Sequence, residues 1–281
     1  MIEVLLAGLA TSIQDAGRFG YRYLGVPVSG AMDSCSFQLA NALLNNSNNC
    51  ACIEMAYSGP LLKFHCDTYI ALSGADYCFK VNKHPVDVNQ VIKIDAGDIL
   101  SCGHSKNGVY AYLALQGGLQ SEICLKSRSY YATLTENSTI KRGQLIAYKK
   151  STSTILNRSK IKHKIQGLSL VKIPAFRGPE FALLSANMQN IVFKKQFTLA
   201  PQSNRMAYQF KSISGIRADE IISSPVQSGT IQLTPSGKMI VLMRDCQTTG
   251  GYARILQLPE ASINRISQLK AGQNFVLSHL S

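Results

Sequence analysis

The chain has 281 residues, 46% of them hydrophobic, which fits a globular protein of one large or two medium domains. Its 29 basic and 16 acidic residues give a formal net charge of +13, which suits an anionic partner of some kind. The densest basic segment has no interleaved aromatic residues, and the sequence has no paired zinc ligands, which argues against binding of nucleic acid. No apolar run reaches the roughly 18 residues of a membrane-spanning helix.

The N-terminus and the cysteines indicate the compartment. Residues 1–8 are apolar but carry Glu3 and lack a positive n-region, so we expect a first β-strand rather than a signal peptide. The eight cysteines form no Cys-x-x-Cys pair, and scattered cysteines usually act as small buried apolar residues. The five histidines show no ligand spacing. We therefore expect a cytoplasmic protein with no metal site and no membrane partner.

A polar loop and the clearest helix of the sequence follow the first strand. Residues 11–20 contain two glycines and bring Gln14, Asp15 and Arg18 within five positions. Apolar residues then recur at helical spacing over 34–44, where Ser29 or Asp33 would cap the helix. Backbone N–H groups at this N-terminus favour anions, although ordinary helix capping also explains the loop.

Short strands dominate the next part of the chain. Segments rich in β-branched and aromatic residues alternate with Gly, Pro or Asn. We expect strands at 52–57, 61–64, 69–72, 77–81, 91–94, 99–102 and 110–115, with a hairpin at 80–85. This succession predicts a mainly β protein with a few helices, as a barrel or a sandwich.

A basic connector is expected between two β-rich halves. No carboxylate lies between Glu136 and Glu180, whereas lysines and arginines are frequent there. This segment is either a solvated connector or a docking surface for an acidic partner protein. In the second half we expect a strand at 170–173 and a short helix at about 179–188. Further strands are expected around Phe197, Ile213, Ile221, Ile231, Met239, Ile255 and Phe275.

A polar segment behind the apolar run 239–243 has more hydrogen-bonding capacity than a simple turn needs. It begins at Asp245 and continues as Gln247-Thr248-Thr249-Gly250-Gly251-Tyr252. The adjacent glycines allow close approach by another group, and the amide, hydroxyl and carboxylate side chains supply donors and acceptors. Composition alone leaves a ligand-binding loop and a hairpin turn with satisfied polar groups equally open.

Several motifs together resemble the family of allophanate hydrolase subunit 2, also called the biotin-dependent carboxyltransferase family. They are Gln14-Asp15-Ala16-Gly17-Arg18-Phe19-Gly20, the loop over 25–33, Leu72-Ser73-Gly74-Ala75-Asp76, Ser127-Arg128-Ser129, Pro201-Gln202-Ser203-Asn204-Arg205-Met206 and the segment 245–252. Their order and spacing match the family across nearly the whole chain. The family usually has Asp at Asn204, Gly at Ala207, Arg at Cys246 and Gly at Lys126.

The resemblance implies two cyclophilin-like β-barrel subdomains with the active region between them. We place them at residues 1–150 and 169–281, joined by the basic connector 151–168, with strands able to exchange between them. Cyclophilin-like names a fold, and nothing in the sequence indicates prolyl isomerase activity.

The family also implies three functions. The first is the C component of a prokaryotic ATP-dependent 5-oxoprolinase, an amide (lactam) hydrolase that opens 5-oxoproline to glutamate together with a KipI-type partner, the B component, and with an A component. The second is a biotin-dependent carboxyltransferase acting on a urea-like or amide-like acceptor. The third is a non-enzymatic KipA-type regulator that binds a kinase-inhibitor partner. In both enzymatic interpretations, the substrate is a small lactam or amide.

No cofactor motif lies in this chain. It has no phosphate loop of the Gly-x-x-x-x-Gly-Lys-Ser/Thr type and no Met-Lys-Met biotinylation signature. We therefore expect ATP to be handled by the assembled complex, and biotin to be supplied by a separate carrier in the carboxyltransferase interpretation only.

Lactam opening and carboxyl transfer both develop negative charge on an amide oxygen and both require proton transfer. The predicted catalytic residues are Asp15, Arg18, Asp33 and Asp245. The predicted substrate-binding residues are Gln14, Ser29, Gly30, Asp76, Arg205, Gln247, Thr248, Thr249, Gly250, Gly251 and Tyr252. For Asp76 a hairpin corner, and for Arg205 an ion pair with a nearby carboxylate, are the alternatives. We expect the segments around Asp15, Asp33 and Gln247 to converge between the two barrels.

Overall fold

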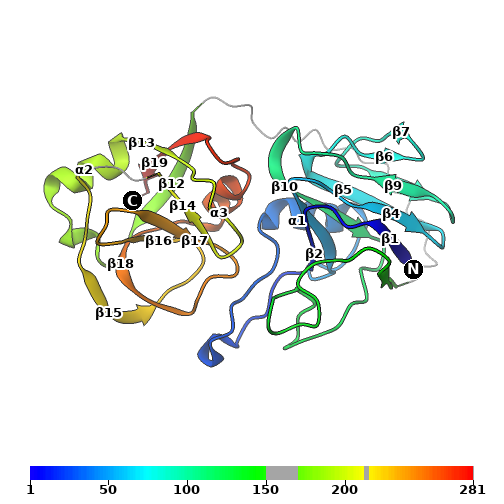
Figure 1. The fold of residues 1–281 in the computed structure, drawn as a ribbon, viewed down its shortest axis with the longest axis horizontal. Helices are drawn as coiled ribbons and strands as arrows, with labels where there is room; N and C mark the ends of the chain where they lie inside the picture. The colour runs from blue at the N-terminus through cyan, green and yellow to red at the C-terminus, as the bar shows by residue number, and fades with distance from the viewer. Residues whose placement is uncertain (150–169, 212–214, 281) are drawn as a thin grey trace. The chain divides into compact units, whose positions relative to one another are not determined.

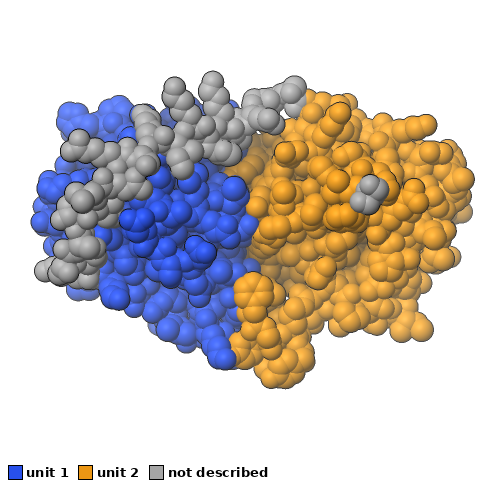
Figure 2. Space-filling model, turned by 180° about the vertical axis from the view of Figure 1, so that it is seen from behind, with its two compact units in different colours: residues 1–18, 29–167 blue, residues 19–28, 168–281 orange. Residues whose placement is uncertain are grey.

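The computed structural model describes residues 1–149, 170–211 and 215–280. The chain forms two compact units, the first made of Met1–Arg18 and Ser29–Gly167 and the second of Phe19–Val28 and Leu168–Ser281 (Figure 2). Residues 19–28 thus belong to the second unit, although the sequence placed them within an N-terminal subdomain of residues 1–150. The predicted connector 151–168 and the strand expected around Ile213 lie outside the described residues.

The first unit contains two antiparallel sheets (Figure 1). One has the order β11-β1-β4-β9-β6-β7, with β11 (Leu145–Ile146), β1 (Ile2–Leu6), β4 (Leu61–Phe64), β9 (Ile99–Ser101), β6 (Lys80–Val81) and β7 (His84–Pro85). The other has the order β2-β3-β10-β5-β8, with β2 (Ala10–Gln14), β3 (Cys52–Ala56), β10 (Asn107–Leu115), β5 (Thr68–Asp76) and β8 (Val91–Ile94). The predicted mainly β class is confirmed.

Helix α1 (Ser34–Leu43) packs on β5 and β10 of the second of these sheets. The Asp33 side chain caps it by accepting the Ser36 N–H at 3.2 Å, as the sequence predicted for one of two candidate caps. Phe37 lies on its buried face and contacts the Tyr112 ring edge-on, with ring centroids 6.1 Å apart. The loop before this helix is therefore anchored on a buried sheet surface.

Strand β2 was not predicted, because its sequence Ala-Thr-Ser-Ile-Gln is polar. All of its residues after Ala10 are nevertheless buried, and it pairs with β3 over its full length. Polar side chains buried in a sheet need partners, and those of Ser12 and Gln14 belong to the site described below. The hairpin expected at 80–85 forms as β6 and β7, with Asn82 and Lys83 in the left-handed region.

The second unit is built on one large sheet of order β13-β19-β12-β18-β16-β17-β14, with β15 pairing to β18. Its strands are β12 (Val171–Arg177), β13 (Gln196–Thr198), β14 (Ala207–Gln209), β15 (Glu220–Pro225), β16 (Thr230–Leu233), β17 (Met239–Leu242), β18 (Thr249–Gln257) and β19 (Asn274–His279). Strands β12 and β19 run parallel, and the other strand pairings described in this unit are antiparallel. Phe197, Phe210 and Phe275 form an aromatic cluster in its core.

The helices of the second unit differ from prediction. The helix expected at 179–188 is instead a short 3₁₀ turn, η2 (Phe181–Leu183), followed by α2 (Ala186–Lys194). The break falls at Ser185, whose hydroxyl accepts the Met188 N–H and starts a new helix. Helix α3 (Glu260–Ser267) was not predicted, although the proline directly before it, Pro259, suits the start of a helix. A second 3₁₀ turn, η1 (Arg22–Leu24), lies in residues 19–28.

Within the described ranges, no helix is long and apolar enough to cross a membrane. All eight cysteines are free thiols. Burial raises the pKa of the Cys52 and Cys102 thiols, so these two behave as small apolar core residues.

Candidate functional site

Asp15 is the centre of a buried hydrogen-bond cluster in the first unit. Its side chain accepts four hydrogen bonds: from the Ser127 hydroxyl at 2.7 Å, the Ser129 hydroxyl at 2.7 Å, the Gly17 N–H at 2.8 Å and the Arg128 N–H at 2.6 Å. Three of these donors share Oδ1, and the Arg128 N–H binds Oδ2. Two segments that are far apart in sequence, 14–18 and 127–129, are thereby joined. The geometry favours Asp15 as an anchor of both loops.

Gln14 and Arg18 extend the same cluster. Gln14 Nε2 donates to the Ser12 hydroxyl at 3.0 Å and to the Tyr130 carbonyl at 3.2 Å. The Arg18 side chain is only 1% exposed, and its Nη2 donates to the Ser129 carbonyl. A fully buried guanidinium is rare in proteins and is costly unless it is paired. The predicted residues of the first motif are therefore built into the interior of the unit.

The loop before α1 lies against this motif. The Ala31 N–H donates to the Asp15 carbonyl at 3.1 Å, and a side chain at Gly30 would contact the Ala16 and Gly17 backbone at 3.0 Å. Gly30 has φ +87 and Ser29 has φ +57, a conformation that is uncommon for a residue other than glycine. The Ser29 hydroxyl is buried and has no hydrogen-bond partner among the described residues. The structure thus brings the first two predicted segments together.

Glu54, which the sequence analysis did not single out, holds the loop before α1 from below. Its Oε2 accepts the Met32 N–H at 2.8 Å and the Tyr112 hydroxyl at 2.8 Å, and the same hydroxyl accepts the Asp33 N–H at 2.8 Å. Burial, followed by the nearby Glu54 and Asp33 charges, raises the pKa of Tyr112 well above its ordinary value. Tyr112 therefore stays protonated and remains a donor to Glu54.

Glu54 and Tyr112 belong to a row of paired residues that crosses four neighbouring strands. Ser12 pairs with Glu54, Glu54 with Tyr112, and Tyr112 with Ser73, on β2, β3, β10 and β5 in turn. Directly paired residues share a face of the sheet, so these four side chains lie in line beneath α1. The signal for Glu54 was available in the sequence: it is a lone carboxylate inside the apolar strand Cys-Ile-Glu-Met-Ala.

Asp76 lies elsewhere, at the end of β5. Its Oδ1 accepts the Cys78 N–H at 2.8 Å, and its carbonyl accepts the Lys106 N–H at 2.8 Å. These are the contacts of a hairpin corner, which was the alternative interpretation of this residue.

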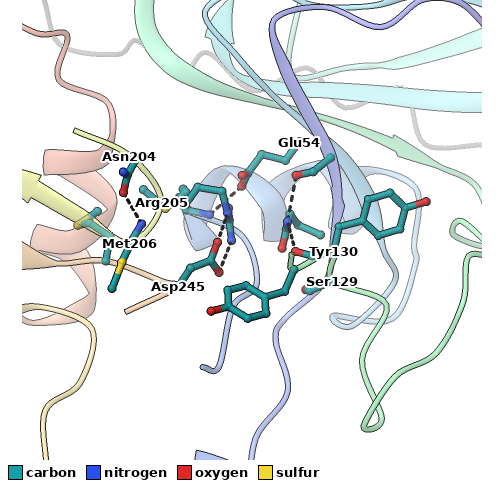
Figure 3. Close-up of polar contacts among 12 residues, drawn as sticks. Glu54, Ser129, Tyr130, Asn204, Arg205, Met206 and Asp245 are labelled. Carbon is teal, nitrogen blue, oxygen red and sulfur yellow. Dashed lines mark hydrogen bonds and ion pairs between the residues drawn. The ribbon is translucent and has the colours of Figure 1, made fainter. Parts of the chain in front are cut away.

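In the second unit, Arg205 and Asp245 form a bidentate ion pair (Figure 3). Arg205 Nε lies 2.8 Å from Asp245 Oδ2, and Nη2 lies 3.1 Å from Oδ1. Asn204 beside them accepts the Met206 N–H at 2.8 Å and the Ala207 N–H at 3.1 Å through its side-chain oxygen. An Asp at position 204 could accept the same two bonds, so this departure from the family keeps the turn. Arg205 is thus paired with a carboxylate, as one of its two interpretations stated.

The predicted loop 245–252 divides at Thr249: residues 245–248 lie outside any strand, and the rest is the start of strand β18. Residues from Thr249 onward belong to β18, and the Thr248 carbonyl accepts the Val226 N–H at 3.0 Å. Gly250 lies so close to Gln232 that a Cβ there would come within 2.7 Å of its side-chain nitrogen. The backbone of this loop is therefore firmly held.

Four polar side chains of the same loop have no hydrogen-bond partner among the described residues. Within the described part of the chain, no hydrogen bond is made by the side chains of Gln247, Thr248, Thr249 or Tyr252. Tyr252 is 38% exposed and Thr249 is exposed as well. Polar side chains that are held on a rigid backbone, and that make no hydrogen bond within the protein, are suited to binding a ligand. This contrasts with Asp15, whose Oδ1 accepts three hydrogen bonds and whose Oδ2 accepts one.

Arg22 fastens residues 19–28 to this loop inside the second unit. Its Nη2 donates to the Val226 carbonyl and, at 3.3 Å, to the Thr248 carbonyl. It also hydrogen-bonds Cys246, where burial raises the thiol pKa and Arg22 opposes that rise. The family usually has Arg at position 246, and in this chain the guanidinium of Arg22 lies near the Cys246 thiol.

Each unit therefore has its own cluster of predicted residues: 14–18 and 29–33 in the first, and 205 with 245–252 in the second. The convergence of Gln247 with Asp15 stays a prediction. Across residues 1–149, 170–211 and 215–280, no group of three or more His, Cys, Asp or Glu residues could hold a metal ion.

Residues 24–278 match the family described as carboxyltransferase domain, subdomain A and B. The chain belongs to this family. It is 31% identical to the 5-oxoprolinase C subunit of Haemophilus influenzae, over all of this chain and 92% of that protein. It is 29% identical to the 5-oxoprolinase C subunit of Escherichia coli, over 97% of this chain and 89% of that one.

Urea-processing proteins are similar as well. Urea amidolyase of Lachancea kluyveri is 41% identical over 131 residues, which are 46% of this chain and 7% of that protein. The crystal structure of the Kluyveromyces lactis urea amidolyase matches all of this chain with a TM-score of 0.91 and 26% identity. This chain spans 19% of that one, so the likeness concerns one domain of a much longer protein. The family resemblance stated from the motifs is confirmed.

Proposed function

We propose that this chain is the C component of a prokaryotic ATP-dependent 5-oxoprolinase, which opens the 5-oxoproline lactam to glutamate together with a KipI-type B component and an A component. The observation that carries the proposal is similarity over the whole chain to two proteins named as the C subunit of 5-oxoprolinase, at 31% and 29% identity. The match to the urea amidolyase sequence covers less than half of the chain.

The geometry of loop 245–252 supports a role in binding a lactam or amide. The Gln247 amide and the hydroxyls of Thr248, Thr249 and Tyr252 can donate to and accept from a planar amide, and they have no partners within the described protein. Because Gly250 has no Cβ, the backbone there approaches Gln232 closely. Donors on a fixed backbone stabilise charge that develops on an amide oxygen.

The Arg205–Asp245 pair would place a guanidinium and a carboxylate beside those donors. A bidentate pair orients the guanidinium rigidly. In the proposed enzyme, Asp245 fixes the orientation of Arg205, a predicted substrate-binding residue. ATP would be handled by the assembled complex.

The deciding experiment is reconstitution from the three components. The A and B components with this chain should form glutamate from 5-oxoproline only when ATP is present. Gln247→Ala should lower turnover by about tenfold or more while the complex still co-purifies, because a transition-state hydrogen bond is lost. Gln196→Ala, an exposed glutamine on β13, is the matched control and should leave turnover unchanged. Full glutamate formation without this chain would refute the proposal.

A biotin-dependent carboxyltransferase is the second candidate, favoured by the 0.91 TM-score to the K. lactis urea amidolyase and by the family match. It predicts consumption of carboxybiotin, supplied on a separate carrier, when urea or an amide is added. The same purified chain tested in both assays separates the two functions. Tight binding of a kinase-inhibitor partner, unaffected by Gln247→Ala and Asp15→Ala and with no turnover in either assay, would instead indicate the KipA-type regulator.

A further inference from the structure

A hollow of about 540 Å³ opens in the first unit beside the Asp15 motif. Its described walls come from three stretches: residues 49–51, the turn 117–120, and the side chains of Arg128 and Lys149. This volume falls within the range of sites that hold metabolite-sized molecules. None of the predicted catalytic or substrate-binding residues lines it.

The walls are held in place by backbone contacts. Gly117 and Gly118 both have φ +79, and a side chain at either would collide with the opposite wall. A Cβ at Gly117 would lie 3.0 Å from the Lys149 carbonyl, and a Cβ at Gly118 would lie 3.0 Å from the Cys50 sulfur. Only glycine suits both the conformation and the close approach, so the turn gives the hollow a fixed shape.

The charged groups at the hollow are both cations. Arg128 is held by Nη1 on the Ser121 carbonyl and by Nη2 on Gln120 Oε1 at 3.0 Å, and its backbone N–H is bound to Asp15. Its guanidinium is thus oriented by neutral oxygens and keeps further N–H groups for a ligand. Among the described residues, neither Arg128 nor Lys149 forms an ion pair. No carboxylate belongs to the described lining.

A neutral donor completes the set. The Asn49 side-chain oxygen is taken by the Ala16 N–H at 3.1 Å, which leaves the Asn49 NH₂ as its hydrogen-bonding group. The nearest carboxylate in the network, Asp15, is occupied by four donors. An oriented guanidinium, an ammonium group and an amide NH₂ match the oxygens of a carboxylate or phosphate.

We propose that this hollow is a binding site for a small oxyanion, a molecule that carries a carboxylate or a phosphate group. All of its described lining residues belong to the first unit and none to loop 245–252, so the proposal does not depend on the function proposed above. Through Arg128 and Asn49, its occupant would contact residues that hold Asp15 and Ala16 in place.

Cys50 provides a test in the unaltered protein. Cys50 lines the hollow, whereas Cys66 is exposed in the same unit and is not one of the described lining residues, so alkylation of the two by iodoacetamide can be compared by mass spectrometry. Inorganic phosphate and glutamate are titrated separately at constant ionic strength. We expect saturable slowing at Cys50 and no change at Cys66. The compound that protects at the lower concentration identifies phosphate or carboxylate as the preferred group. Unchanged alkylation of Cys50 with both compounds, or equal slowing at both thiols, overturns the proposal.

Variants then assign the binding to the cations. Arg128→Gln should weaken protection of Cys50 by about tenfold or more, since it removes a charge-assisted hydrogen bond. Lys149→Gln should weaken it less, because Lys149 is exposed. Lys141→Gln, an exposed lysine outside the hollow, is the control and should bind as the unaltered protein does. An equal loss in Lys141→Gln would indicate a general charge effect and refute the site. If Arg128→Gln fails to fold by circular dichroism, the Lys149→Gln result decides.

Discussion

Tyr112 and Glu54 face each other on β10 and β3 and share a 2.8 Å hydrogen bond in an interior position where both are at most 2% exposed. The tyrosine hydroxyl also accepts the Asp33 N–H, while the carboxylate accepts the Met32 N–H. Two backbone groups of the loop before α1 are therefore satisfied by side chains of the sheet. The position of that loop depends on this pair.

Tyr112→Phe should destabilise the protein by about 1–3 kcal/mol, because it leaves the buried Asp33 N–H without its acceptor and removes a donor from Glu54. Tyr148→Phe is the control, because its hydroxyl bonds the Cys66 carbonyl at an exposed position and should cost less than about 1 kcal/mol. Urea denaturation measures both. Hydrogen exchange at Met32 and Asp33 should quicken in Tyr112→Phe only, and equal stability of the two variants would contradict the role given to Tyr112.

Asp15→Asn should cost about 3 kcal/mol or more. The amide NH₂ would point a donor at one or more of the four donor groups, which would lose a charge-assisted hydrogen bond. The unfolding free energy is the measurement. Asp95→Asn is the control, because Asp95 is 63% exposed and paired only with Lys93 among the described residues, and it should change stability by less than about 1 kcal/mol. A fully stable but inactive Asp15→Asn would show that Asp15 acts in catalysis rather than as an anchor.

The first unit shows which features can be predicted from the sequence and which cannot. Helix α1 and most strands of the first unit follow from periodicity, because apolar residues alternate or recur there at regular spacing. Strand β2 escapes that rule, since most of its buried side chains are polar, and the Gln14 amide donates to the Tyr130 carbonyl, more than a hundred residues away. Asp15 was singled out by its motif, but three of its four partners, on residues 127–129, depend on tertiary structure.

The second unit shows the same limit. The Arg205–Asp245 pair was one of two interpretations available from the sequence, and only the fold brings the two side chains together. The placement of residues 19–28 was not predictable from composition, because it depends on Arg22 reaching carbonyls more than two hundred residues away. Local sequence patterns determine where helices and strands form, whereas contacts such as Arg205–Asp245 and those of Arg22 depend on how these elements pack.

Arg22→Ala should release residues 19–28 from the second unit without unfolding either unit. The substitution removes the donors to the Val226 and Thr248 carbonyls and the contact with Cys246. Limited proteolysis should then cut at η1, whose Tyr23 is 82% exposed, faster than in the unaltered protein. Arg142→Ala, an exposed arginine of the first unit, is the control. Unchanged cleavage at η1 would mean that other contacts hold this segment.

The Glu180–Arg254 pair should make the second unit sensitive to acid. Arg254 Nε and Nη2 donate to the Glu180 carboxylate at 2.9 and 2.7 Å, and the Arg254 N–H donates at 2.9 Å. These hydrogen bonds outweigh burial and hold the pKa of Glu180 below its ordinary value. A carboxyl whose pKa is lower in the folded state stabilises the protein above its unfolded-state pKa, and that stabilisation is lost as the pH falls through the folded-state pKa.

Glu180→Gln should therefore lower Tm near neutral pH and lose less Tm than the unaltered protein when the pH is reduced to about 3. The glutamine keeps one acceptor oxygen for Arg254 but has no charge to lose, so its Tm should depend less on pH over this range. The control is Glu3→Gln, because Glu3 is paired with His65 in the other unit and is partly exposed. Scanning calorimetry from neutral to acid pH resolves the comparison. A Glu180→Gln protein whose Tm falls as steeply as that of the unaltered chain would show that this ion pair contributes nothing to the acid response.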